Sequence, residues 1–177
     1  MRAPRVHTIV ACFVLAALAA CNAPVGSGVT TAPSYRDANV PIGVTSRFDA
    51  AKFAGLWRVR AVLPEADKFE QLAFRGGTFR IGADVCDPAG ICFTAAEDLP
   101  TRRTGPGRYV ITMPGGEQRR LWVLWVDEGF RTALVGSPDG TFAWILDRAA
   151  TGGADRIRAA REILDFNGYD TTFLKEL

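Results

Sequence analysis

The chemistry open to this chain of 177 residues depends on its few nucleophiles and bases, which include one histidine, four cysteines and three lysines. A serine or cysteine nucleophile in acyl transfer needs a neighbouring base, and most catalytic zinc sites use histidine as a ligand. The histidine is His7, close to the amino terminus. Whether this segment remains in the working protein therefore decides which reactions are possible.

Residues 1–20 have the composition of a targeting segment. Arg2 and Arg5 precede a run of 12 small or apolar residues from Ile9 to Ala20. A membrane-spanning helix needs about 20 such residues, so the run is too short to cross a bilayer. One interpretation is an ordinary secretory signal that is cut near Ala20.

The residues at the end of this segment favour a second interpretation. Leu18-Ala19-Ala20-Cys21 resembles the lipobox of bacterial lipoproteins. This resemblance implies a signal peptide over residues 1–20 and a mature chain that begins at Cys21, which carries a diacylglyceryl thioether and an N-acyl chain. Several acyl chains together give a lasting membrane anchor. Asn22 follows Cys21, and by analogy with enterobacterial sorting this implies an outer-membrane lipoprotein that faces the periplasm.

Removal of residues 1–20 changes the composition. The segment holds two arginines and no acidic residue, so the formal charge falls from +2 to zero, and His7 and Cys12 are lost as well. A neutral chain without blocks of like charge does not fit nucleic-acid binding. Because the mature chain has no imidazole, histidine-dependent catalysis is excluded. We expect a protein that is not an enzyme and that has no metal or cofactor.

The other reactive residue types fit structural positions. Ser137 lies in Gly136-Ser137-Pro138-Asp139-Gly140, which is not the G-x-S-x-G elbow of hydrolases and predicts a hairpin turn. Neighbouring carboxylates on a strand point to opposite faces, so adjacent acids do not form an acid–base pair. We therefore interpret the following as solvated surface residues: Lys52, Lys68, Lys175, Glu97, Asp98, Asp127 and Glu128.

Short β-like segments dominate the chain after a linker. Residues 21–39, rich in Gly, Pro, Ser, Thr and Ala beyond Cys21, are predicted to be a flexible tether, and residues 40–177 a folded domain. Apolar alternation between turn signals predicts an antiparallel sandwich or barrel. The expected strands are Trp57–Leu63, Phe79–Val85, Tyr109–Met113, Leu121–Val126, Phe130–Gly136 and Thr141–Leu146.

One segment is predicted to be helical. Ala154–Phe166 places Ile157, Ala160 and Leu164 on one apolar stripe, and Asn167-Gly168 supplies a left-handed stop. A single stripe implies a single packing surface. We expect this helix to lie against the β body.

An ordered set of motifs resembles the lipocalins. Gly55-Leu56-Trp57 follows Phe48-Asp49 and Lys52-Phe53, as at the start of that family. The second half resembles the bacterial outer-membrane lipocalins over Leu121–Asp127, Phe130-Arg131, Ala133–Pro138, Trp144–Arg148 and Gly168–Asp170. The resemblance implies an up-and-down barrel of about eight strands with the C-terminal helix packed outside. It also implies a structural signature in which Arg148 packs across Trp57, close to Gly55, at the closed end.

The region between Glu70 and Leu121 departs from the family pattern because it is shorter. A barrel that is shortened or partly open in this region is therefore expected, and Phe130 stands where the family usually has Tyr.

Cys86 and Cys92 enclose a turn that contains Pro88 and Gly90. In an exported protein this spacing predicts a disulfide, since the mature chain offers neither His nor other Cys for a metal site beyond the lipidated Cys21.

The resemblance implies a cup for a hydrophobic ligand. The candidate lining residues are Val59, Ala61, Trp122, Leu124, Phe142 and Trp144, and plain core packing is the alternative for each. Trp122 and Trp125 are expected to face opposite ways. Arg102, Arg103 and Arg108 could meet an anionic head group. The expected function is a membrane-anchored carrier of a fatty acid, a lysophospholipid or a similar amphiphile. The alternatives are a filled barrel that acts as an envelope interaction or inhibitor module, and an enzyme acting on small hydrophobic substrates.

Overall fold

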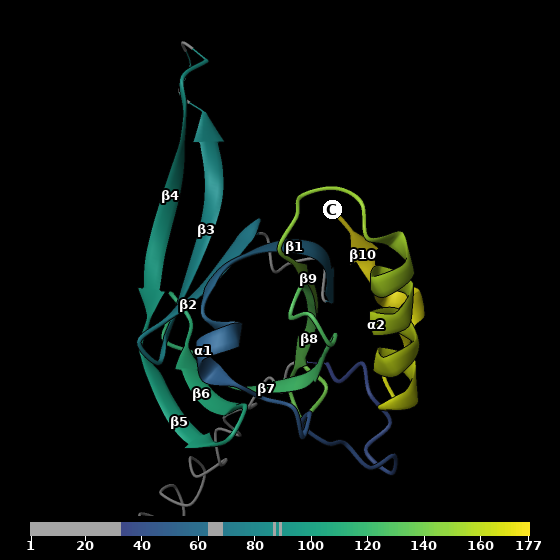
Figure 1. The fold of residues 1–177 in the computed structure, drawn as a ribbon. Coiled ribbons are helices and arrows are strands. Elements are labelled where there is room, and N and C mark those ends of the chain that lie inside the picture. The colour runs from purple at the N-terminus through teal and green to yellow at the C-terminus, as the bar shows by residue number, and fades with distance from the viewer. Residues whose placement is uncertain (1–32, 64–68, 87, 89) are drawn as a thin grey trace, which may run out of the picture. The chain divides into compact units, whose positions relative to one another are not determined.

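Ten strands form one antiparallel sheet that curls around an apolar interior, with one long helix outside it (Figure 1). The computed structural model describes residues 33–63, 69–86, 88 and 90–177, so the predicted signal peptide and Cys21 lie outside the described residues. The elements are α1 (Ala50–Phe53), β1 (Gly55–Leu63), β2 (Gln71–Arg75), β3 (Thr78–Cys86), β4 (Cys92–Leu99), β5 (Thr101–Gly105), β6 (Arg108–Thr112), β7 (Gln118–Val126), β8 (Thr132–Gly136), β9 (Ala143–Asp147), α2 (Ala154–Phe166), a 3-10 turn (Thr171–Phe173) and β10 (Lys175–Glu176).

The sheet is open between β4 and β5. Its strand order is β4-β3-β2-β1-β9-β8-β7-β6-β5, and β10 pairs with β1. The two end strands are consecutive in the chain and are separated by Pro100, which lacks a backbone N–H. Around this break the amide of Phe79 donates to Thr101 Oγ1 (3.1 Å), and the amide of Thr112 donates to the carbonyl of Pro100 (2.9 Å). The expected up-and-down architecture is confirmed, in its partly open form.

The hairpin of β3 and β4 is long, although the sequence between residues 70 and 121 allowed for a shortened barrel. Its ladder runs from the pair Phe79–Leu99 to the pair Cys86–Cys92, and the hairpin extends beyond the other strands (Figure 1). The predicted disulfide is confirmed between Cys86 and Cys92 at the tip. The short middle region therefore contains one extended hairpin, followed by the shorter strands β5 and β6.

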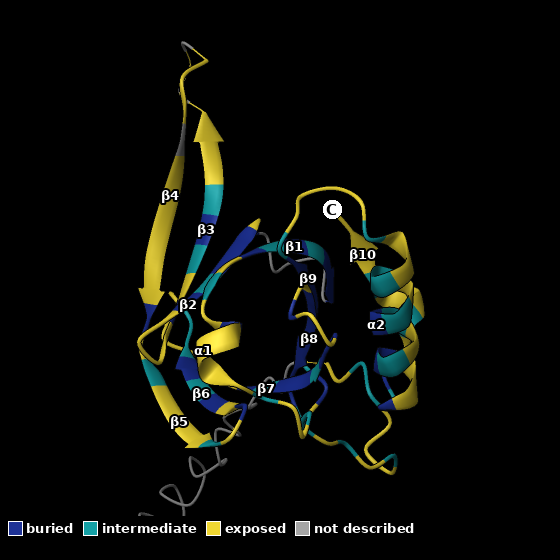
Figure 2. Ribbon diagram, viewed as in Figure 1, coloured by how far each residue is buried: buried dark blue, intermediate teal, exposed yellow. Residues whose placement is uncertain are grey.

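Two apolar clusters lie on opposite sides of the barrel wall. The inner cluster contains Phe53, Trp57, Val59, Val62, Phe69, Leu72, Phe74, Phe79, Leu99, Tyr109, Ile111, Leu121, Val123, Val126, Phe130, Ala133, Val135, Phe142, Trp144 and Leu146. The outer cluster contains Ala61, Leu63, Leu124, Leu134, Ala143, Ile145, Ala160, Leu164 and Tyr169, with Trp122 and Trp125 packed against it. The buried residues of both clusters run along β1 and β7–β9 (Figure 2).

Two β-bulges decide which residues belong to which cluster. The register of β1 with β9 shifts between Val59 and Ala61, so Arg60 is the extra residue. The register of β7 with β8 shifts between Val123 and Trp125, so Leu124 is the extra residue. An extra residue moves every later side chain to the other face of a strand with a period of two.

The sheet faces expected for Ala61, Trp122 and Trp125 are therefore wrong. Ala61 was expected to share a face with Trp57 and Val59, but it lies in the outer cluster. Trp122 and Trp125 were expected to face opposite ways, but both pack against the outer cluster. The bulge between the two tryptophans is the physical reason.

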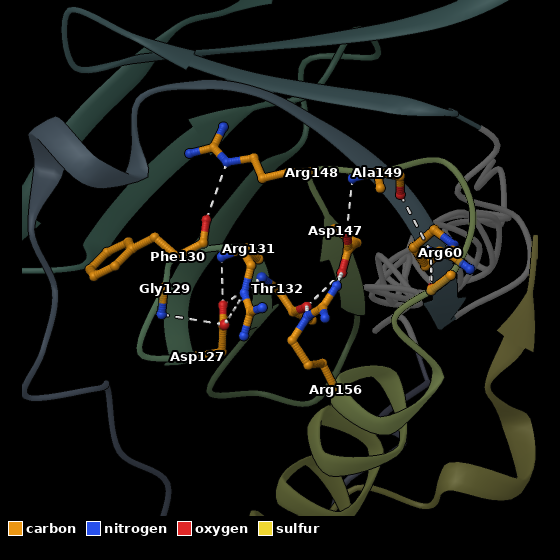
Figure 3. Close-up of polar contacts among 11 residues, drawn as sticks. Arg60, Asp127, Gly129, Phe130, Arg131, Thr132, Asp147, Arg148, Ala149 and Arg156 are labelled. Carbon is orange, nitrogen blue, oxygen red and sulfur yellow. Dashed lines mark hydrogen bonds and ion pairs between the residues drawn. The ribbon is translucent and has the colours of Figure 1, made fainter.

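The helix predicted over Ala154–Phe166 is confirmed as α2. Ala160 and Leu164 are buried and Ile157 is half-buried, so the predicted stripe faces the barrel. Gly168 adopts a φ of 84°, which fits the predicted left-handed stop. A buried polar group also connects the helix to the sheet, because Arg156 donates to Thr132 Oγ1 (2.8 Å) and to Asp147 Oδ2 (3.0 Å; Figure 3).

The folded unit begins before Val40. It spans Ala32–Leu177, and part of the expected tether packs on it. The amide of Tyr35 donates to the carbonyl of Gly140 (2.9 Å), and Arg36 Nε donates to the carbonyl of Asn167 (2.7 Å). The predicted boundary was too late because composition alone does not show backbone pairing such as the bridge between Arg36 and Tyr169.

Arg148 closes one end of the barrel. Its Cζ lies 3.6 Å from the centroid of the Trp57 ring, which fits the implied pairing. Its guanidinium donates to the carbonyls of Lys52 and Ala54 (2.9 Å each) and Leu56 (2.8 Å), and its Nε donates to the carbonyl of Phe130 (3.3 Å; Figure 3). Arg148 therefore ties α1, β1 and the turn before β8 to the end of β9.

Substitution of Arg148 should destabilise the whole fold. Arg148→Ala removes a cation–π contact and leaves several carbonyls at the closed end without a partner, so the free energy of unfolding should fall by about 2–4 kcal/mol. Arg148→Lys should recover only part of this loss, because an ammonium cannot reach the same carbonyls as the planar guanidinium. Urea denaturation measures the change, with Arg75→Ala at an exposed site as control. Equal stability of the Arg148 and Arg75 variants would contradict this role.

Candidate functional site

Aromatic side chains line the open end of the barrel, opposite Trp57. The Phe142 and Trp144 ring centroids are 4.5 Å apart, and Phe69 meets Trp144 edge-on at 4.7 Å. Arg119 completes the row, with its Cζ 5.6 Å from the centroid of the Phe142 ring. The row therefore runs from a guanidinium across the rings of Phe142 and Trp144 to Phe69.

A groove of about 250 Å³ continues from Phe69 along the β3–β4 hairpin. Its lining residues are Phe69, Ile81, Gly82, Ala83, Ala95, Ala96 and Glu97. Ala83 pairs directly with Ala95, so two small side chains stand where larger ones would fill the space. The groove is apolar except for the exposed carboxylate of Glu97.

The turn between β8 and β9 holds Phe142 in place. Ser137 Oγ accepts from the amides of Thr141 (2.9 Å) and Phe142 (3.2 Å), and Gly140 adopts a φ of 75°. The hairpin turn predicted from Pro138-Asp139-Gly140 is confirmed. Asp139 adds an ion pair across to Arg120 of β7 (3.0 Å).

Asp139 is ionised over most of the pH range. Partial burial raises its pKa, but hydrogen bonds from Ser137, Arg120 and Thr141 outweigh burial and lower the pKa to about 2. A lowered carboxyl pKa in the folded state stabilises the fold above the unfolded pKa, and this contribution is lost as the pH falls through the folded value.

Asp139→Asn should therefore reduce stability in a pH-dependent way. At pH 7 we expect a loss of about 1 kcal/mol, since a side chain that is 40% exposed is well screened. The difference between wild type and variant should close as the pH falls from about 4 to 2, where the wild-type carboxylate also becomes protonated. Thermal unfolding at several pH values measures this. A difference that does not depend on pH would show that the carboxylate charge has no part in holding the turn.

Arg119 is a charged group placed at the aromatic rim. Its side chain is 18% exposed, and it pairs with Glu117 at 3.0 Å. In the ladder between β6 and β7, Arg119 lies opposite Ile111, whose side chain belongs to the inner cluster. The side chain of Arg119 therefore also points toward the barrel axis. A guanidinium has five N–H donors and can exchange one carboxylate partner for another anionic group.

The expected ligand residues are divided between the two faces. Val59, Phe142 and Trp144 lie in the inner cluster. Ala61 and Leu124 lie in the outer cluster and Trp122 packs against it, so these three side chains do not line the interior. The bulges at Arg60 and Leu124 explain the difference.

The arginines expected to meet a head group lie at the wrong end. Gly107, in the turn that follows Arg102 and Arg103, approaches Phe48, which packs on Phe53 at the closed end. Arg108 lies over the outer face of Trp122, 4.7 Å from its ring centroid. Arg119 is the arginine that lies at the open end. Because Arg119 stands two residues before the inner residue Leu121 on β7, strand alternation could have indicated that its side chain points inward.

Asp127 has a structural role that the sequence did not indicate. It was expected to be a solvated turn residue, but it is buried and accepts from the amides of Arg131 and Thr132 (2.5 and 2.7 Å; Figure 3). Burial raises its pKa, but these hydrogen bonds outweigh burial and hold the pKa below the usual value. The carboxylate thus replaces strand hydrogen bonds in the turn from β7 to β8.

The described part of the chain contains neither a cluster of metal ligands nor a membrane-spanning helix. Its side chains form no group of three or more His, Cys, Asp or Glu that could hold a metal ion. None of its helices combines the length and apolarity needed to cross a bilayer.

Comparisons with known proteins agree with this geometry. The family model for a lipocalin-like domain matches residues 109–177. Curated protein sequences gave no match. Among solved structures, lipocalin 12 from rat epididymis aligns with a TM-score of 0.55 and 16% identity over 81% of this chain and 91% of that chain.

Two other structures have the same arrangement. Lobster apocrustacyanin A1 gives a TM-score of 0.53 and 17% identity over 82% of this chain and 92% of its own. The bovine lipocalin allergen Bos d 2 gives 0.51 and 14% identity over 72% and 93%. At these identities the likeness shows the fold, which is therefore that of a lipocalin.

Proposed function

We propose that this lipocalin fold binds one small hydrophobic or amphiphilic ligand at its open end. The observation that carries the proposal is the continuous apolar path from the Phe142–Trp144 pair past Phe69 into the groove beside Ile81 and Ala83. Ligand sites are typically concave and apolar with a few placed polar groups. The function is binding rather than catalysis.

The charges at the rim suggest how an amphiphile would lie. Arg119 at one end of the aromatic row suits a carboxylate or phosphate, while the carboxylate of Glu97 at the far end does not. An acyl chain would cross the rings and enter the groove. A fatty acid or a lysophospholipid fits this order of groups.

The groove volume sets a condition on binding. At about 250 Å³ it lies just below the range of roughly 300–1,000 Å³ that is common for ligand pockets. Phe69 is 5% exposed and lies between the groove and Trp144. Displacement of this ring would extend the groove toward Trp144 and admit a longer chain.

A filled barrel without a ligand is the second candidate function. Phe142 and Trp144 are fully buried, so the aromatic row also resembles an ordinary core. In that case the protein would act through its surface as an interaction or inhibitor module of the cell envelope.

Ligand titration should separate the two candidates. Dodecanoate should bind the wild type saturably and more tightly than dodecanol, because Arg119 recognises the carboxylate. Arg119→Ala should lose about tenfold in affinity for the acid and little for the alcohol. Ala95→Leu should weaken both ligands by filling the groove, and Ala51→Leu, on exposed α1, serves as the matched control. Calorimetry measures all four proteins. Absence of saturable binding would favour the filled barrel.

We further propose that Cys21 anchors the protein to the outer membrane through acyl chains, so that the carrier faces the periplasm. The support is the lipobox-like sequence Leu18–Cys21 and the short apolar run before it. An anchored carrier could store the ligand or pass it between the membrane and the periplasm.

Cys21→Ala should release the protein from membranes. Without the thiol no thioether forms, and the remaining segment is too short to span a bilayer. Fractionation of cells that express wild type or Cys21→Ala, with Cys12→Ala as the matched control, measures the distribution. Retention of Cys21→Ala in the membrane fraction would contradict the lipid anchor.

A further inference from the structure

A second cavity lies outside the barrel, in the angle between the wall and α2. Its volume is about 370 Å³, within the common range for small ligands. The cavity is lined by Arg60, Ala61, Ile145, Gly152, Ala154, Ile157, Arg158, Arg161, Leu174 and Glu176. Helix α2 and β10 form its outer sides, next to β1 (Figure 1).

The floor of this cavity is apolar. Ala61 and Ile145 are fully buried partners across β1 and β9, and Ile157 and Leu174 are half-buried above them. The bulge at Arg60 is what turns Ala61 toward this outer face. The same bulge that removed Ala61 from the barrel interior therefore helps to build the second cavity.

The rim of the cavity is cationic. Arg60 donates to the carbonyls of Ala149 (3.4 Å) and Gly152 (3.0 Å; Figure 3), which orient its guanidinium without neutralising it. Arg161 donates to the carbonyl of Thr171 (3.1 Å) and lies 3.7 Å from Glu176. Arg158 makes no hydrogen bond or ion pair with the described residues.

The charges on the rim do not cancel. Three guanidinium groups face one carboxylate, so the lining has an excess of two positive charges. The amino-terminal end of α2 lies at the same cavity, and no side chain within the described residues caps its first turn. Asp155 in the first turn of α2 offsets part of the positive charge of the helix amino terminus, so the attraction for an anion comes mainly from the three guanidinium groups.

We propose that this cavity binds an anionic amphiphile, with a phosphate or carboxylate head held by Arg60, Arg158 and Arg161 and an apolar group against Ile145, Ile157 and Leu174. The site is separate from the open end of the barrel. Its head-group chemistry is shared by soluble anionic amphiphiles and by anionic membrane lipids.

The first test uses hexyl phosphate as a soluble probe with the full chain carrying Cys21→Ala. Titration followed by amide chemical shifts should give saturable changes at Ile157 and Leu174. Inorganic phosphate should bind more weakly, because it leaves the apolar floor uncovered. Arg158→Glu should weaken hexyl phosphate binding by about tenfold, since it removes the charge excess without breaking a contact made by Arg158. Arg75→Glu is the matched control and should bind as wild type does.

The second test distinguishes the source of the anion and the site. Stronger binding of Cys21→Ala than of Cys21→Ala/Arg158→Glu to phosphatidylcholine vesicles containing phosphatidylglycerol would indicate a membrane lipid. Hexyl phosphate binding without such vesicle binding would indicate a soluble ligand. Arg119→Ala should leave the shifts at Ile157 and Leu174 unchanged. Shifts confined to Phe69 and Ile81, or equal affinity of Arg158→Glu and its parent, would overturn the proposal.

Discussion

The contact between Arg148 and Trp57 determines which end of the barrel can be used. The guanidinium covers the indole at 3.6 Å, and its donors reach carbonyls at the carboxyl-terminal end of α1. Around it, Phe53, Phe74, Phe79 and Tyr109 pack with ring centroids 4.8–6.4 Å apart. This end is therefore filled by aromatic rings that pack on one another. The surfaces that remain for a ligand are the opposite end and the outside of the barrel wall.

At the opposite end, the β3–β4 hairpin shapes the surface. Pro100 separates β4 from β5, so the β3–β4 hairpin continues alone beyond the barrel and presents small inward residues such as Ala83 and Ala95. A closed barrel would have placed further strands against them. The groove beside Phe69 thus lies on a hairpin whose outer strand, β4, has no further partner strand in the sheet.

Much of the fold could be predicted from the sequence because the relevant signals are local. The period of apolar residues and the Asn167-Gly168 stop gave the bounds of α2, and the spacing of Cys86 and Cys92 gave the disulfide. The pairing of Trp57 with Arg148 came from the resemblance to lipocalins.

The facing of several site residues could not be predicted. In Leu121–Val126 both faces are apolar, so the alternation that would reveal a bulge at Leu124 is missing. The bulge at Arg60 likewise reverses Ala61 without changing the residue types around it. The positions of Phe69 and Arg119 depend on contacts between strands that are distant in the sequence. A single-sequence pattern does not contain these contacts.

The central claim is that a ligand lies across the aromatic row and enters the β3–β4 groove. Isotope-filtered nuclear Overhauser effects between unlabelled dodecanoate and the ¹³C-labelled protein test it most directly. We expect contacts from the acyl chain to the Phe69 ring and to the methyl groups of Ile81 and Ala83. Bound dodecanoate that contacts instead the outer-face residues Leu124 and Leu134, with none of those inner contacts, would contradict it.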